Sequence, residues 1–178
     1  MSANTQAKEN SALESCFEWV SMLISAILVV VFVFTFAFRV VGVSGDSMCN
    51  TLQDGDRLVL ITQLYKLDRG DIVVVCREGE EPYIKRIIAL AGDTIDIDDE
   101  KGCVLLNGEV LDEPYVLGGF TPAFDFDGPY TVKDGEVFAM GDNRLWSLDC
   151  RELGPFSVED IVGEASFRLF PFRSIGVI

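Results

Sequence analysis

The chain has 178 residues, enough for one modest domain and an accessory segment. Its formal net charge of −15 at pH 7 argues against binding nucleic acid or being held on an anionic membrane by charge. Because the chain has no histidine, a Ser-His-Asp triad, a Cys-His dyad and His-based metal sites are excluded. The five cysteines form no Cys-x-x-Cys pair. We therefore expect no metal, no cofactor and free thiols, although an oxidising compartment would allow one disulfide.

The amino-terminal part is expected to hold a membrane anchor. Residues 1–16 are polar and predict a disordered tail. The run Trp19–Phe38 carries no charge and lies between Glu18 and Arg39. As a helix it would cover about 30 Å, the thickness of the hydrocarbon core. A buried core helix would rarely be apolar for so long, and the flanks do not resemble a cleaved signal peptide. We predict a single-pass anchor over residues 17–39, although the flanking charges do not set its orientation.

The remaining residues, 40–178, predict a β-rich domain. Short β-branched runs separated by turn residues are typical of strands. These runs are Arg57–Ile61, Asp71–Val75, Tyr83–Leu90, Thr94–Ile97 and Cys103–Leu106. Asn107 and Gly108 predict a tight hairpin, and residues 117–130 an irregular loop. Since no helical periodicity interrupts the strands, we predict a mainly antiparallel coiled sheet or partly open barrel.

Lys85 is the basic residue with the greatest chemical interest. Strand alternation places Tyr83, Lys85, Ile87 and Ala89 on one face. A lysine there either extends to solvent at a sheet edge or lies in a pocket. Burial in a pocket would lower its pKa, and a neutral lysine is a competent general base for a serine nucleophile. Without histidine, a Ser–Lys pair is the main remaining route to serine peptidase chemistry.

Four segments are richer in Gly, Asp, Ser and Arg than folding requires: Ser44–Leu52, Gly70–Val74, Tyr83–Asp93 and Gly141–Arg151. In order and spacing they resemble the sequence boxes of bacterial type I signal peptidases. The resemblance implies a Ser–Lys endopeptidase that removes signal peptides from exported preproteins. It also implies a cell-membrane protein whose catalytic domain lies on the extracytoplasmic side. The short interval between the last two segments resembles the compact Gram-positive form.

The resemblance assigns roles to individual residues. Ser47 matches the nucleophile, Lys85 the general base, and Ser147 the serine that orients the lysine amine. The family's structural charged network is matched by Arg86, Asp142, Arg144, Asp149 and Arg151. The backbone N–H of Ser47 would donate to the oxyanion. Gly45 stands where some members place a serine hydroxyl, so a second donor stays open. Taken singly, each charged residue would be read as a solvated loop residue, and Ser147 as the cap of a turn.

The family cuts after small residues, typically alanine one and three places before the bond. By position, the shallow apolar pockets would be lined by Val41, Val43, Met48, Tyr83 and Ile84. Each of these alone would equally suit core packing. Two residues depart from the family pattern: Asn50 stands where proline is usual, and Cys150 where serine is usual. Asn50 could loosen the turn after the nucleophile, whereas Cys150 is close in shape to serine.

Two other readings compete with this one. A self-processing Ser–Lys peptidase of the repressor type fits poorly, because the chain has a membrane span and no helical DNA-binding domain. A membrane-anchored β-domain that binds secretory partners without cleaving them would be expected to lose Ser47 or Lys85, and both are present.

Overall fold

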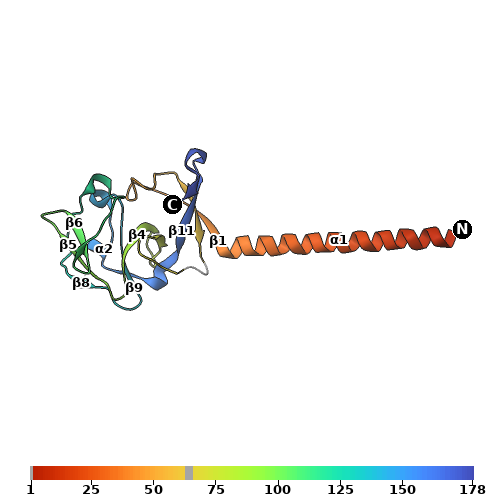
Figure 1. The fold of residues 1–178 in the computed structure, drawn as a ribbon, viewed down its shortest axis with the longest axis horizontal. Coiled ribbons are helices and arrows are strands. Elements are labelled where there is room, and N and C mark those ends of the chain that lie inside the picture. Colours follow the sequence, from red (N-terminus) through yellow and green to blue (C-terminus); the bar gives the residue numbers. More distant parts are fainter. Residues whose placement is uncertain (1, 63–65) are drawn as a thin grey trace. The chain divides into compact units, whose positions relative to one another are not determined.

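The computed structural model describes residues 2–62 and 66–178 (Figure 1). The chain divides into two units, one ending at Phe38 and one running from Arg39 to Ile178. The first unit is a single helix, α1 (Ser2–Ala37). The expectation of a disordered tail over residues 1–16 is therefore wrong, because the helix extends back to Ser2. No glycine or proline interrupts the sequence from residue 2 to 37, so nothing local breaks the helix.

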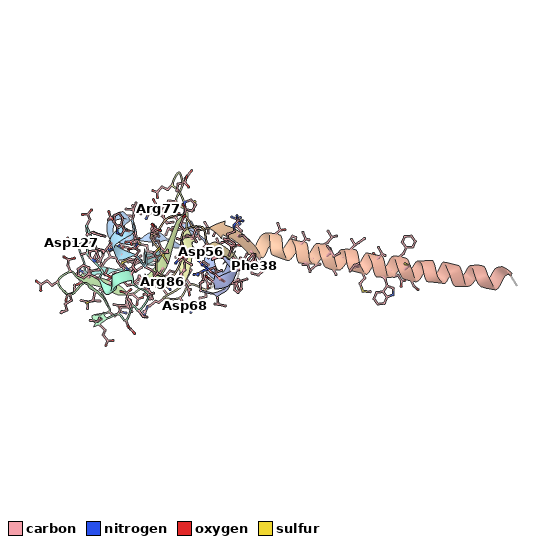
Figure 2. All side chains as sticks on the ribbon, turned by 90° about the horizontal axis from the view of Figure 1, so that it is seen from above. Phe38, Asp56, Asp68, Arg77, Arg86 and Asp127 are labelled. Atoms are coloured by element: carbon pink, nitrogen blue, oxygen red, sulfur yellow. The ribbon has the colours of Figure 1, made fainter. Side chains whose placement is uncertain are left out.

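Helix α1 contains the stretch Ser15–Phe32, which is apolar and long enough to cross a membrane. Its mean hydropathy is 2.1, and all of its side chains are exposed within the unit. Figure 2 shows side chains standing out from the helix. Two hydroxyl groups in and after this stretch bond within the helix: Ser25 donates to the Ser21 carbonyl at 2.9 Å, and Thr35 to the Val31 carbonyl at 2.7 Å. Such internal bonding leaves few polar groups for a solvent to satisfy.

The second unit is built on an eight-stranded sheet in which the strands from β2 to β10 pair antiparallel along the order β1-β2-β11-β3-β4-β9-β10. Strand β12 pairs with β11 off this path. Their bounds are β1 (Phe38–Gly42), β2 (Arg57–Ile61), β3 (Ile72–Val75), β4 (Tyr83–Leu90), β9 (Glu136–Met140), β10 (Phe156–Ser157), β11 (Ile161–Phe170) and β12 (Gly176–Val177). The long strand β11 has three register shifts along its length, and it pairs first with β3 and then with β2. The sheet curls as a result into a half-barrel.

A smaller four-stranded sheet has the order β7-β6-β5-β8. Its strands are β5 (Thr94–Asp98), β6 (Cys103–Leu106), β7 (Glu109–Val110) and β8 (Tyr130–Thr131). In Figure 1, β5, β6 and β8 gather at the end of the domain away from β11. Side chains such as Ile95, Val104 and Phe138 form a core shared by the two sheets. A second core, which includes Met48, packs the connection between β1 and β2 against strands β2, β3 and β11.

The mainly β, antiparallel fold predicted from the sequence is confirmed. Strands β2, β4 and β6 have the predicted bounds, and β6 and β7 form the hairpin at Asn107–Gly108. One detail differs. A register shift between Ile87 and Ala89 inserts an extra residue, so the strict alternation expected along β4 ends there.

Short helical turns complete the domain: η1 (Leu117–Gly119), η2 (Arg144–Trp146), α2 (Cys150–Leu153), η3 (Val158–Asp160) and η4 (Phe172–Ser174). Two connections position the chemistry described below. One is the turn between β1 and β2, and the other is the loop from β9 to α2.

Candidate active site

Ser47 lies in the turn between β1 and β2, and its side chain is half-buried. Two neighbours fix this turn from below, because Met48 and Leu52 are almost fully buried in the second core. Backbone hydrogen bonds close it, from the Cys49 N–H to the Asp46 carbonyl at 3.1 Å and from the Leu52 N–H to the Met48 carbonyl at 2.8 Å. The turn therefore holds the serine hydroxyl at a set position above an apolar floor.

Lys85 reaches this hydroxyl from β4. Its amine Nζ lies 3.0 Å from Ser47 Oγ. The Lys85 side chain is only 2% exposed, so it lies in a pocket and does not extend to solvent at a sheet edge. Burial lowers the pKa of the Lys85 amine from 10.5 to about 8, against an opposing effect of the Asp149 charge. A sizeable neutral fraction near neutral pH follows, together with a hydroxyl within proton-transfer distance.

The loop after β9 packs directly on the turn that carries Ser47. The Asn143 backbone N–H donates to the Ser47 carbonyl at 3.0 Å, and its side-chain amide donates to the Asp46 carbonyl at 3.1 Å. Gly141 allows this approach. A Cβ on Gly141 would come within 2.5 Å of the Ser47 carbonyl oxygen and 2.3 Å of Ser147 Oγ, so only glycine fits.

Asp149 is the centre of a buried hydrogen-bond network in this loop. Its carboxylate is fully buried and accepts two hydrogen bonds of 2.9 Å from the guanidinium of Arg151. It also accepts from the Gly141 N–H at 3.0 Å and from the Ser147 hydroxyl at 2.7 Å. Burial acts to raise the pKa of the Asp149 carboxyl, but these bonds and the Arg151 charge outweigh it and hold the pKa below its ordinary value. Asp149 therefore stays ionised and fixes the loop.

Ser147 lies in the same loop, where its hydrogen bond is to Asp149. Its hydroxyl is buried and donates to Asp149, and no hydrogen bond between described residues joins it to Lys85. Donation to a carboxylate leaves the oxygen lone pairs of Ser147 free to accept from an amine. Its role toward Lys85 stays a prediction.

A second network connects Asp142 to the nucleophile turn. Arg86, which follows Lys85 on β4 and is labelled in Figure 2, holds the Asp142 carboxylate with two bonds of 2.8 and 2.7 Å. Burial acts to lower the Arg86 pKa, but the hydrogen bonds that Arg86 donates to Asp142 and the negative charge of Asp142 outweigh it and raise the pKa. The Thr51 hydroxyl donates to the same carboxylate. Thr51 therefore ties the turn to the loop, and nothing in the sequence pattern pointed to it.

Arg168 on β11 holds the other end of the same turn. Its guanidinium donates to the Thr51 carbonyl and lies 3.2 Å from the carboxylate of buried Asp56. Asp56 in turn accepts from the Gln53 N–H at 3.1 Å. These contacts fix the chain directly after Asn50, through the carbonyl of Thr51. Arg168 could not be identified from the sequence, since its partners are far away in the chain.

Arg144 does not approach Ser47 through its side chain. Its guanidinium is fully buried and bonds Glu113 at 3.0 Å, Thr121 at 2.6 Å and the Gly141 carbonyl at 2.9 Å. It therefore ties the loop to the irregular segment before β8. Of the five charged residues assigned to the network, all are at least largely buried and paired, which rules out the alternative of a solvated loop for them.

A cavity of about 560 Å³ opens beside Ser47 and Lys85. All five residues expected to line the substrate pockets lie on its wall: Val41, Val43, Met48, Tyr83 and Ile84. Val74 and Val162 add further apolar surface, and Arg39 and Glu81 are charged members of the same wall. A cleft of this size with the two reactive groups on its wall has the form of a peptide- or ligand-binding site.

Cys150, which stands where serine is usual in the family, fits into the interior of the domain. Cys150 is buried, and its sulfur accepts the Ala139 N–H at 3.2 Å. Burial raises the pKa of this thiol to about 12, so it stays protonated. All five cysteines are unpaired. Within residues 2–62 and 66–178 there is also no group of three or more acidic, cysteine or histidine side chains arranged to hold a metal.

A lysine amine 3.0 Å from a serine hydroxyl, at the side of an apolar cleft on a coiled β-sheet, is an arrangement suited to a serine hydrolase that works without histidine. Comparison with known proteins agrees. Residues 16–170 match the family model described as signal peptidase, peptidase S26. The chain therefore belongs to the signal peptidase family and is a serine endopeptidase.

Individual relatives support the same assignment. The chain is 36% identical to signal peptidase I of Bacillus licheniformis, over 96% of this chain and 97% of that one. It is 35% identical to signal peptidase I S of Bacillus subtilis (strain 168), over 93% and 95% of the two chains. Among solved structures, a signal peptidase I from Enterococcus faecalis V583 matches with a TM-score of 0.50 and 26% identity. The match covers 58% of this chain and all of that one.

Proposed function

We propose that this chain is anchored in a membrane by α1 and cleaves signal peptides from exported preproteins after small residues. Ser47 is the nucleophile and Lys85 the general base. The observation that carries the proposal is the 3.0 Å contact between Lys85 Nζ and Ser47 Oγ in a buried setting that lowers the lysine pKa to about 8. Family membership supports the substrate class.

The chemistry follows from these two groups. Neutral Lys85 takes the Ser47 proton as Oγ attacks the carbonyl carbon of the scissile bond. The backbone N–H of Ser47 donates to the resulting oxyanion. The Lys85 ammonium then protonates the leaving amine, which is the new amino terminus of the mature protein. Water, deprotonated by Lys85, finally hydrolyses the ester on Ser47.

Selection for small residues is supported by the cavity wall. Val43 and Met48 are buried against the floor, and Ile84 packs on the same core. Because these side chains bring close-packed apolar atoms to the wall beside Ser47, we assign to it shallow pockets that suit a methyl group better than a larger side chain. The two alanines of an Ala-x-Ala site are the residues we assign to this wall.

The anchoring role of α1 is supported by the length and exposure of Ser15–Phe32. A peptidase held in the membrane meets a substrate whose own apolar signal segment lies in the same membrane, which raises their effective concentration. We place the domain that starts at Arg39 on the extracytoplasmic side, where exported preproteins emerge.

Cleavage of a preprotein by the full-length protein in detergent tests the proposal. The wild type is expected to cut after an Ala-x-Ala site and to fail when the alanine before the bond is replaced by phenylalanine. Ser47→Ala should show no cleavage. Ser174→Ala is the matched control, because Ser174 is an exposed serine on η4, and it should cleave like the wild type. Cleavage at the same bond by a folded Ser47→Ala protein would refute the assignment.

A further inference from the structure

Three apolar side chains are exposed on the loop that packs against Ser47. They are Leu145, Trp146 and Leu148, here called the Trp146 patch. Trp146 is 78% exposed. The residues between and around them, among them Asn143 and Ser147, are buried. The loop is thus mostly buried, but its large apolar side chains are exposed to solvent, which indicates an interaction surface.

The backbone under the patch is held rigidly, so the exposure is a fixed feature. The Trp146 N–H donates to the Asn143 carbonyl at 3.0 Å, which closes the η2 turn. Arg151 donates to the Arg144 carbonyl at 2.7 Å, at the start of the same turn. The patch is therefore preorganised, and binding to it would cost little ordering of the loop.

The position of the patch follows from the contacts of Ser47. Asn143 bonds the Ser47 carbonyl, and Gly141 lies against it, so the loop touches the nucleophile directly. The cavity wall, in contrast, is built from β1, β3, β4, β11 and the nucleophile turn, and includes none of the residues 141–149. The cavity and the patch are thus separate surfaces: Ser47 lines the cavity, and the loop that carries the patch bonds to the Ser47 backbone.

A peptide substrate has to pass Ser47 and continue on both sides of its scissile bond. When the residues before the bond fill the cavity, those after it leave over another surface next to Ser47. We propose that the Trp146 patch binds apolar side chains at the first two positions after the bond, so that the enzyme also selects on the start of the mature protein. This inference rests on the proposed function.

The chemistry of the patch favours an apolar peptide segment. An indole ring and two leucines offer a surface without charge, and aromatic side chains give much contact area with little conformational freedom to lose. We expect one well-placed apolar side chain there to change kcat/KM by about tenfold. A membrane surface is the competing occupant, and the experiment separates the two.

Two peptides test the inference with the full-length protein in detergent micelles. They are identical up to and including an Ala-x-Ala site and differ only in the next two residues, Leu-Phe in one and Ser-Asn in the other. The wild type is expected to favour the first by about tenfold in kcat/KM. Trp146→Ala should bring this ratio close to one, and Trp146→Phe should keep most of it. Phe172→Ala is the matched control, because Phe172 is also 78% exposed but lies on η4, and it should keep the wild-type ratio.

The outcomes are distinct. A wild-type ratio that survives in folded Trp146→Ala would overturn the inference. An equal loss for both peptides in Trp146→Ala would also overturn it, and would point to contact with the micelle or membrane. If the wild type cleaves neither peptide, or if Ser47→Ala cleaves both, the proposed function fails and the inference with it.

Discussion

Lys85 and Arg151 are both 2% exposed, but their surroundings differ. Arg151 donates two hydrogen bonds to the Asp149 carboxylate and others to backbone carbonyls. Lys85 takes part in none of the ion pairs formed among residues 2–62 and 66–178, and its partner is the neutral hydroxyl of Ser47.

The difference shows how burial can serve two purposes in one site. Around Arg151 every charge is paired, so burial strengthens the bonds that shape the loop. Around Lys85 no ion pair forms among the described residues, and the nearby Asp149 charge offsets only part of the desolvation, so the amine loses its proton more readily. The paired region supplies a rigid frame, and the unpaired lysine supplies the reactivity.

Replacing the lysine by a residue that cannot lose its charge should have the largest effect. Lys85→Arg is expected to lower kcat by at least about a thousandfold, because a guanidinium does not deprotonate in proteins and cannot accept the Ser47 proton. Single-turnover cleavage of a preprotein with an Ala-x-Ala site measures it. Activity within about tenfold of the wild type would show that Lys85 is not the base.

Breaking the paired region should mainly cost stability. Asp149→Asn leaves the buried Arg151 charge without its partner, which we expect to cost about 3–5 kcal/mol of unfolding free energy. Asp98→Asn is the control, because Asp98 pairs with the exposed Lys101, and it should leave the free energy of unfolding close to that of the wild type. Chemical unfolding of the full-length proteins in detergent compares them. Equal small losses would mean that the Asp149 network does not hold the domain.

Removing the charge of Lys85, which has no ion-pair partner in the described part of the chain, should instead stabilise the protein. The folded pKa of Lys85, about 8, lies below its ordinary value of 10.5, so the unfolded chain binds the proton more tightly. The resulting destabilisation is fully present below pH 8 and fades as the pH rises toward 10.5. Lys85→Met should therefore be inactive but more stable than the wild type by about 2 kcal/mol at pH 7, with a smaller difference at pH 10. Thermal unfolding at both pH values is the measurement, and a less stable variant at pH 7 would contradict the unpaired burial of Lys85.

Ser147 connects the two regions, and its loss should have a smaller effect. Ser147→Ala removes the hydrogen bond that the Ser147 hydroxyl donates to Asp149, and with it the hydroxyl predicted to orient the Lys85 amine. We expect a loss of about ten- to a hundredfold in rate. An unchanged rate with a lowered melting temperature would show that Ser147 serves only the loop.

The sequence predicted the local parts of this structure better than the long-range ones. Strands β2, β4 and β6 were predicted with their bounds because alternation and turn residues mark them within a few positions. The longest strand, β11, was missed. It has three register shifts, and a Cβ at Gly163 would lie 2.7 Å from the Ile61 carbonyl oxygen, so the residues it can hold depend on the neighbouring strands.

The same limit applies to the site. Ser47 and Lys85 could be proposed from the sequence because each stands in a recognisable segment. Thr51, Asn143 and Arg168 could not, because each acts through a partner that only the fold brings near. The burial of Lys85 also could not be predicted, because strand alternation alone is compatible with both an exposed sheet edge and a buried pocket.

The pH dependence of cleavage tests the central claim most directly, namely that neutral Lys85 activates Ser47. With the full-length protein and a preprotein carrying an Ala-x-Ala site, kcat should rise about tenfold per pH unit below the lysine pKa and level off above it, with the midpoint near 8. Asp149→Asn should move this midpoint down, because the Asp149 charge raises the pKa of Lys85. An optimum near pH 4, in the range of carboxyl groups, would contradict the account and point to an acidic mechanism.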